Sequence, residues 1–220
     1  MNLTTGTVIS QLPTGTIDNM QAVIPISIGM PSSPQTIQAS LTQLFALGGI
    51  ALISTTTVGV GGVADVTFSA IPATYTHLRI MYSARSNRVN VGDPLGMQIN
   101  GDTGAKYDWL KKLITHSATL VTTEGLAGTF ADCGQLTGST APAGDFSTGF
   151  LELPGYAGAN SNKSGYGDCV MRSAATTGTF RSYQSIFYFA STSAISSIRL
   201  FPSIGTAFEQ YSVFSLFGYK

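Results

Sequence analysis

Residues 65–84 read DVTFSAIPATYTHLRIMYSA. Apolar and polar residues alternate over 65–71 and again over 77–84, and Pro72 stands between the two runs. Alternation with a period of two is typical of a β-strand with one buried face, and proline interrupts a strand because it lacks the backbone N–H. The stretch therefore predicts two strands joined by a turn. The core residues expected from it are Phe68, Ile71, Leu78 and Ile80.

The same kind of pattern continues through most of the chain. Further strands are expected at 50–58, 95–99, 109–114, 119–123, 129–136, 146–153, 169–173, 183–189, 197–201 and 211–218. Asn100-Gly101 supplies the positive φ that a tight hairpin turn needs, and the small-residue segments 138–144 and 157–167 are expected to be loops. Many short strands separated by glycine and proline turns predict an all-β fold, a jelly-roll-like β-sandwich.

The first 49 residues differ from the rest. Proline limits two short extended pieces at 8–13 and 22–28, and apolar residues spaced three and four apart predict one small helix over 36–47. A segment of this size is too small to bury a core of its own. We therefore divide the chain into an N-terminal anchoring segment, 1–49, and a jelly-roll-like β-sandwich domain, 50–220. The residues expected to make anchoring and oligomer contacts are Ile9, Leu12, Ile24, Ile26, Ile28, Ile37, Leu41, Leu44 and Phe45.

Charge is scarce in this chain. Of its 220 residues, 43% are hydrophobic and only 10% are charged, and 11 Lys and Arg balance 11 Asp and Glu. Soluble domains usually carry about 25% charged residues and a net charge away from zero. We therefore expect much of the surface to lie against partners. The alternative is a surface that Ser, Thr, Asn and Gln keep solvated in place of charged residues. Nucleic-acid binding is not expected, because it depends on clustered Lys and Arg.

No membrane insertion or export is expected from the sequence. The first residues, MNLTT, lack the basic start and apolar run of a signal peptide. The longest apolar stretch, 44–53, contains two glycines and is shorter than the roughly 20 residues of a membrane helix. Synthesis in a cytoplasm is therefore expected. Cys133 and Cys169 are then expected to be reduced and buried rather than joined in a disulfide.

The enzyme motifs in the chain are incomplete. Residues 59–64, GVGGVA, fit the G-x-G-x-x-A dinucleotide fingerprint, but a strand is expected to follow instead of the required helix. Around Ser147, a nucleophile elbow would need glycine at position 145, which is Asp145. The only candidate bases for such a serine are His77 and His116. A hydrolytic pair among the carboxylates stays open as an alternative.

Metal-binding spacings such as H-x-x-x-H, C-x-x-C and the D-x-D-x-D-G calcium loop are absent from the sequence. Asn100, Asp102 and Asp108 are an alternative ion site on a trimer axis, but a turn explains them better. We therefore expect no catalytic residue, no metal and no cofactor. Tyr156 and Tyr166 are the expected receptor or neighbour contacts, because loop tyrosines suit carbohydrate or protein contact; a place at the core edge is the alternative for each.

Four stretches of the chain match, in order, motifs that occur together. Residues 66–80 fit V-x-F-x-x-I-P-x-x-Y-x-H-L, and residues 99–107 contain N-G-D-x-G-x-x-Y. Residues 150–157 are similar to a strand end of the form I-x-x-Y-A, and residues 197–218 to a closing strand pair. Together they resemble the jelly-roll domain of many tailed-bacteriophage virion proteins. The resemblance covers about residues 50–220.

The N-terminal segment carries a second resemblance. ISQLP at 9–13, then the VIPI strand at 23–26 and a small helix, is similar to the attachment segment of phage tail fibres, tail spikes and head fibres. The resemblance implies a protein of the virion, a homotrimer anchored on the particle by its N-terminal segment, with the β domain pointing outward. The implied partners are other phage structural proteins of the tail or capsid, together with a host-surface glycan or protein.

Two functions follow from these resemblances, and a third comes from another class. The first is a short trimeric tail fibre or adhesin, which the anchor-like first 47 residues favour. The alternative is a trimeric capsid decoration (cement) or head-fibre protein that stabilises the phage head, which the low charge and the lack of coiled-coil heptads favour. The third is a cell-surface polysaccharide hydrolase. Of these we expect the fibre, and we do not expect an enzyme.

Overall fold

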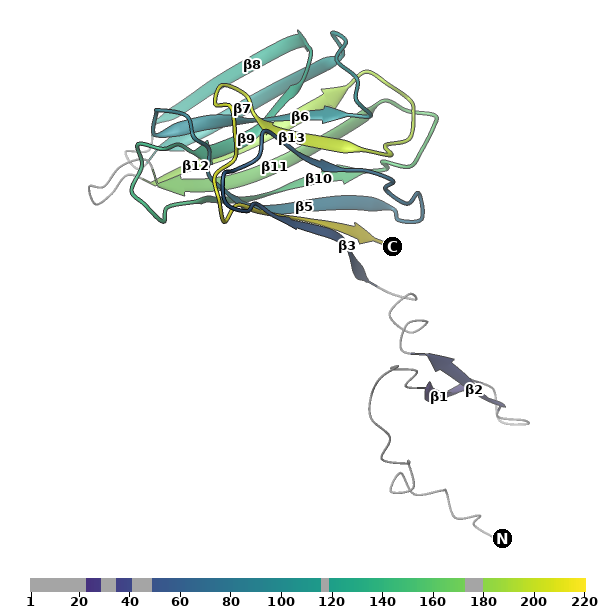
Figure 1. The fold of residues 1–220 in the computed structure, drawn as a ribbon. Coiled ribbons are helices and arrows are strands. Elements are labelled where there is room, and N and C mark those ends of the chain that lie inside the picture. The colour runs from purple at the N-terminus through teal and green to yellow at the C-terminus, as the bar shows by residue number, and fades with distance from the viewer. Residues whose placement is uncertain (1–22, 29–34, 41–48, 116–118, 173–179) are drawn as a thin grey trace, which may run out of the picture. The chain divides into compact units, whose positions relative to one another are not determined.

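The computed structural model describes residues 23–28, 35–40, 49–115, 119–172 and 180–220 (Figure 1). The chain divides into two compact units, Met1–Gly48 and Gly49–Lys220. In the first unit, β1 (Val23–Ile28) pairs antiparallel with β2 (Gln35–Ser40). The extended piece predicted at 22–28 is therefore confirmed as a strand.

The prediction of a small helix over 36–47 is wrong for its first residues, 36–40. Thr36 to Ser40 belong to β2, with Ile37 opposite Ile26 of β1. Cross-strand hydrogen bonds and β-branched residues favour extended backbone here, whereas a short isolated helix is only marginally stable in water. The predicted anchoring residues Ile24, Ile26, Ile28 and Ile37 lie on the paired strands, and their contacts stay predictions. Five others lie outside the described residues: Ile9, Leu12, Leu41, Leu44 and Phe45.

The second unit is a sandwich of two antiparallel sheets, which appear as two layers in Figure 1. In spatial order, the eight-stranded sheet contains β3 (Ile50–Thr57), β14 (Val213–Tyr219), β5 (His77–Ala84), β10 (Ser147–Pro154), β11 (Lys163–Arg172), β12 (Phe180–Phe189), β7 (Tyr107–Thr115) and β8 (Leu120–Gly128). The four-stranded sheet contains β4 (Val66–Phe68), β13 (Ile198–Pro202), β6 (Gly92–Ile99) and β9 (Ala131–Thr137). The predicted all-β sandwich is therefore confirmed.

The strand pairing is that of a long hairpin rolled on itself. β5 pairs with β14, β6 with β13, β7 with β12, and β10 with β11, so early strands pair with late strands in reverse order. The first and third of these pairs lie in the larger sheet and the second lies in the smaller one. The fourth pair also lies in the larger sheet, so the nested pairs are divided between two sheets, which gives the sandwich its jelly-roll-like character.

The core lies between the two sheets. In β5 every second residue is buried, and the same is true of β14. Burying a large aliphatic or aromatic side chain contributes about 1.5–3 kcal/mol, so this alternation holds both sheets together. The four residues predicted for the core are all buried: Phe68, Ile71, Leu78 and Ile80.

Two local predictions need correction. Asn100 and Gly101 have φ of 55° and 66°, and the Ile99 carbonyl accepts from the Asp102 N–H at 3.0 Å, so the predicted tight turn exists. It joins β6 to β7, which lie in different sheets, and is therefore a corner rather than a hairpin. The loop predicted over 157–167 ends earlier, because β11 begins at Lys163.

Candidate functional site

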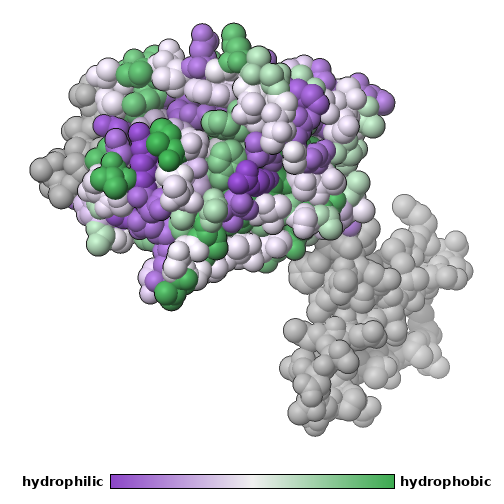
Figure 2. Space-filling model, turned by 45° about the horizontal axis from the view of Figure 1, so that its top comes forward, coloured by the Kyte–Doolittle hydropathy of each residue, from purple (hydrophilic) through white to green (hydrophobic). Residues whose placement is uncertain are grey.

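One face of the eight-stranded sheet packs on the core, and the other points outward; we call the second the outer face. Successive residues of a strand alternate between the two faces. Scattered exposed apolar residues are ordinary on a protein surface, as the green residues of Figure 2 illustrate, but a contiguous group marks an interaction site. The large exposed apolar residues of the outer face are Ile50, Leu52, Met81, Leu110, Ile114, Leu120, Tyr166, Val170, Phe180, Ile186 and Tyr188.

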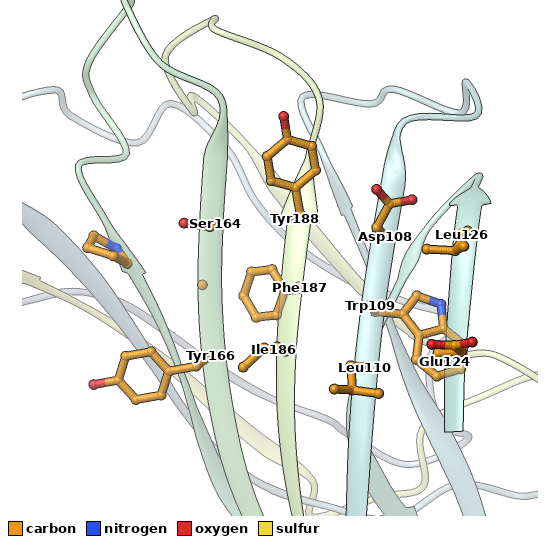
Figure 3. A pocket seen from close by; sticks show the side chains of 12 residues that line it. Asp108, Trp109, Leu110, Glu124, Leu126, Ser164, Tyr166, Ile186, Phe187 and Tyr188 are labelled. Carbon is orange, nitrogen blue, oxygen red and sulfur yellow. The ribbon is translucent and has the colours of Figure 1, made fainter. Parts of the chain in front are cut away.

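A shallow depression lies on the outer face over β11, β12, β7 and β8 (Figure 3). The strand register aligns Tyr166, Ile186 and Leu110 side by side on three neighbouring strands. Tyr188 and Leu126 also line the depression, whose volume is about 500 Å³. It is therefore suited to receive apolar side chains from another molecule.

The acidic groups of the depression lie at one edge. Figure 3 shows the carboxylates of Asp108 and Glu124 on β7 and β8, across the depression from Tyr166. Asp108 Oδ1 accepts a hydrogen bond from the Ala127 N–H at 2.7 Å. One of the two carboxylates is therefore engaged by the backbone, and the depression offers an apolar floor with an acidic edge.

A covered ion pair lies on the outer face beside the depression. Arg79 of β5 pairs with Glu152 of β10, and the side chain of Glu152 is only 6% exposed. The Arg79 guanidinium lies over the rings of Phe150 and Tyr219, at 5.1 and 5.4 Å from their centroids. Since the two charges neutralise each other and the guanidinium lies against aromatic rings, this part of the outer face presents little net charge.

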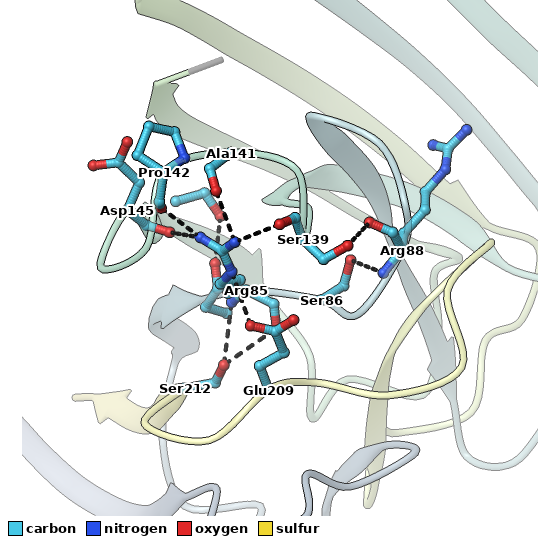
Figure 4. A network of polar contacts seen from close by, with 11 residues as sticks. Arg85, Ser86, Arg88, Ser139, Ala141, Pro142, Asp145, Glu209 and Ser212 are labelled. Carbon is cyan, nitrogen blue, oxygen red and sulfur yellow. Dashed lines mark hydrogen bonds and ion pairs between the residues drawn. The ribbon is translucent and has the colours of Figure 1, made fainter. Parts of the chain in front are cut away.

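Arg85 directly follows β5 and holds the 139–145 loop in place (Figure 4). Its guanidinium donates to the carbonyls of Ser139, Ala141, Pro142 and Asp145, and its Nε pairs with Glu209 at 2.8 Å. All five N–H groups of an arginine are used in this arrangement. A guanidinium without a free donor is a structural clamp rather than a binding group.

Two lysines are buried inside the sandwich unit. Lys111 Nζ pairs with Asp132 at 2.5 Å, and burial raises the pKa of the Asp132 carboxyl although the ammonium beside it opposes this. Lys163 Nζ donates to the carbonyls of Gly158, Ser161 and Thr192. Each ammonium has polar partners, as a buried charge requires, so both lysines stabilise the fold.

Cys133 and Cys169 are free, buried cysteines, as predicted. They are 1% and 3% exposed. Burial raises the pKa of both thiols, so they stay protonated at neutral pH. A protonated, inaccessible thiol is a poor nucleophile and metal ligand.

The two tyrosines predicted as contacts differ in burial. Tyr156 is fully buried; its hydroxyl donates to the Pro72 carbonyl and accepts from the Tyr75 N–H at 3.4 Å. The prediction of a surface contact is wrong for Tyr156, because its ring belongs to the buried core. Tyr166 is half exposed on a strand at the centre of the outer face rather than on a loop. Its contact with a partner stays a prediction.

The residues considered as an ion site do not converge. Asn100 Oδ1 accepts from the backbone N–H groups of Ser196 and Ser197, which ties the corner turn to a neighbouring loop. Asp102 pairs with Lys106, whose ammonium lowers the pKa of that carboxyl. Asp108 lies on β7, beyond the turn. In the part of the chain that the structure describes, no group of three His, Cys, Asp or Glu could hold a metal ion.

The residues considered for nucleophilic chemistry also lie apart. Ser147 is buried, and its hydroxyl donates to the Ala84 carbonyl at 3.0 Å. His77 stacks on Tyr219 at the opposite end of the β5–β10 pair, and His116 lies outside the described residues. Residues 59–64 form a turn that leads into β4 rather than into a helix. No described helix is long and apolar enough to cross a membrane.

The outer face is the feature that the sequence analysis missed. Its signal was present: β11, β12 and β7 carry apolar residues at outward as well as inward positions, instead of a clean alternation. Strands that are apolar on both sides indicate a sheet covered on both sides. The chain matches no family model, no curated protein and no solved structure.

Proposed function

We propose that this chain is a structural virion protein of a tailed phage. It is a short, trimeric tail fibre or adhesin, attached by its N-terminal segment and presenting the β-sandwich to the host surface. The observation that supports this most is the division into a small first unit and a large sandwich. The described part of the first unit is a two-stranded hairpin, β1–β2. A hairpin alone is marginally stable in water and needs a surface to pack on.

A capsid decoration or head-fibre protein is the second candidate. The sandwich begins at Gly49, immediately after the first unit, so no heptad-repeat shaft separates the two. A protein without a shaft suits a place on the head, where an apolar outer face would be covered by neighbours. The two candidates share the trimer and the anchoring segment, and they differ in location and copy number.

Locating the protein on the particle tests the proposal. Particles are labelled with antibody fragments against the sandwich and imaged by electron microscopy. The number of copies of the protein per particle is measured by quantitative mass spectrometry. A small multiple of three or six copies on the tail is the expected result. Hundreds of copies on the head would replace the fibre by the decoration protein. Absence of the protein from purified particles would overturn both.

The role of the first unit is tested separately with a variant that lacks residues 1–48. We expect this variant to fold but not to be incorporated into particles, because its attachment segment is missing. The full-length chain with Ile204→Glu, a change on an exposed loop, serves as the matched control and is expected to be incorporated normally. Normal incorporation of the truncated chain would contradict anchoring by the N-terminal segment.

A further inference from the structure

We infer that copies of this chain associate through the outer face, packed around an axis that runs along β12. The occupant of the outer face is therefore a second copy of the same chain. The number of copies, three, rests on the proposed function; the surface and its pairing of residues do not.

The size of the outer face fits an interface between copies. Eight strands spaced about 4.8 Å apart make it about 34 Å wide, and its outward rows extend about 20 Å along the strands. The whole face covers roughly 700 Å², close to the about 800 Å² that each partner contributes to a stable interface, and an axis along β12 divides this area between the neighbours of a copy.

The charges of the outer face are arranged for self-association. On neighbouring strands, the register aligns Asp168 of β11, Gln184 of β12 and Lys112 of β7. Rotation about an axis parallel to β12 keeps the height of each residue along the strands. It also brings β11 of one copy against β7 of the next. Asp168 of one copy then meets Lys112 of its neighbour, so opposite charges pair across the interface.

The apolar residues match under the same rotation. Tyr166 and Leu110 flank Ile186 at one height, and Val170 and Ile114 flank Ser182 at another. Tyr166 of one copy therefore packs on Leu110 of the next, and Val170 packs on Ile114. Aromatic and aliphatic side chains buried near the centre of an interface supply most of its binding energy.

One acidic group of the outer face, Glu124, meets an ion pair of the neighbouring copy. Glu124 of β8 lies at the height of the Tyr166–Ile186–Leu110 row. At that height, on the other side of β12, lies the Arg79–Glu152 pair. The same rotation brings Glu124 opposite Glu152 of the neighbouring copy, and Arg79, which is paired with Glu152, limits the like-charge repulsion between the two carboxylates.

A charge placed at the centre of the outer face tests the surface. Ile186 and Ile204 are 56% and 58% exposed, but Ile204 lies on the loop after β13, where its N–H donates to Asp93 of the smaller sheet. The full-length wild type and the variants Ile186→Glu and Ile204→Glu are compared by sedimentation velocity. We expect a trimer for the wild type and for Ile204→Glu, and at least a tenfold weaker self-association for Ile186→Glu. Unchanged circular dichroism confirms that both variants fold.

Cross-linking tests the pairing of Asp168 with Lys112 directly, whatever the N-terminal segment does. An equimolar mixture of the single variants Asp168→Cys and Lys112→Cys is treated with a short bis-maleimide and run on a denaturing gel; separate chains are used because the two positions of one chain lie only about 10 Å apart. The native thiols do not interfere, because Cys133 and Cys169 are buried. We expect cross-linked pairs of chains from the mixture, and single chains from wild-type protein treated in the same way.

The outcomes separate the inference from the proposed function. A cross-linked pair together with a wild type that sediments as a dimer keeps the surface but overturns the trimer. If the wild type and Ile186→Glu both sediment as trimers and no cross-link forms, the inference is overturned. The proposed function then still stands. A full-length chain that is monomeric at every concentration overturns the inference together with the trimer.

Discussion

Arg85 shows how much a single residue holds together in this fold. Its guanidinium is buried, and it ties four carbonyls of the 139–145 loop and the carboxylate of Glu209 to the end of β5. Loss of a buried charged partner is severe because the groups left behind stay desolvated and unpaired. The loop therefore depends on one side chain from a distant part of the chain.

We expect Arg85→Met to lower the free energy of unfolding by about 3–5 kcal/mol, because methionine keeps the apolar stem but donates no hydrogen bond. Urea denaturation measures the change. The matched control is Arg199→Met: that arginine is 41% exposed and pairs with Asp65 at 3.1 Å. A surface pair of this kind contributes about 1 kcal/mol or less. Similar losses in the two variants would contradict the clamp.

At the scale of elements, β11 shows why glycine is placed inside a strand. Gly165 and Gly167 face the core, and a Cβ on Gly165 would collide with the ring of Phe187 and with the Glu152 carbonyl. Because Gly165 has no side chain, the ring of Phe187 from β12 can lie over β11 at this position. Glycine in a strand often marks such a close approach. The same glycines made the beginning of this strand resemble a loop in the sequence.

We expect Gly165→Ala to destabilise the protein by about 1–3 kcal/mol, because overpacking a filled site forces backbone and ring to shift. Thermal unfolding measures it as a fall in Tm of roughly 2–4 °C per kcal/mol for a chain of this size. Gly59→Ala is the matched control, since a Cβ there meets nothing within 4 Å. An unchanged Tm for Gly165→Ala would mean that the strand is less tightly covered than described.

At the scale of the whole molecule, the two units differ in their ability to fold. The sandwich contains a contiguous core of buried residues from both of its sheets. The described strands of the first unit pair only with each other. A domain with its own core folds alone, whereas a two-stranded hairpin is marginal.

We expect a chain of residues 49–220 to unfold cooperatively with a Tm close to that of the full-length protein. We expect a peptide of residues 1–48 to show no cooperative transition, because a segment of this length is too small to bury a core of its own. Circular dichroism melts and amide hydrogen exchange measure both. A peptide that melts cooperatively as a monomer would contradict the dependence of the first unit on a partner.

Local pattern carried most of the fold prediction, and its failures have physical causes. The alternation in 65–84 located two strands and four core residues correctly. Spacings of three and four misled over 36–40, because pairing with β1 outweighs helical periodicity in so short a piece. Tyr156 lies on a loop, as predicted, but its ring is buried and its hydroxyl hydrogen-bonds to residues 72 and 75.

The amino-acid sequence by itself determined the class of fold, because period-two alternation and turn residues act between near neighbours in the chain. Only the tertiary structure decided which strands lie next to one another. Tyr166, Ile186 and Leu110 form one row because β12 pairs with both β11 and β7. Side-chain alternation says which residues of a strand share a face, but strand order and register say which strands share it. The outer face therefore exists only once the sheet has formed.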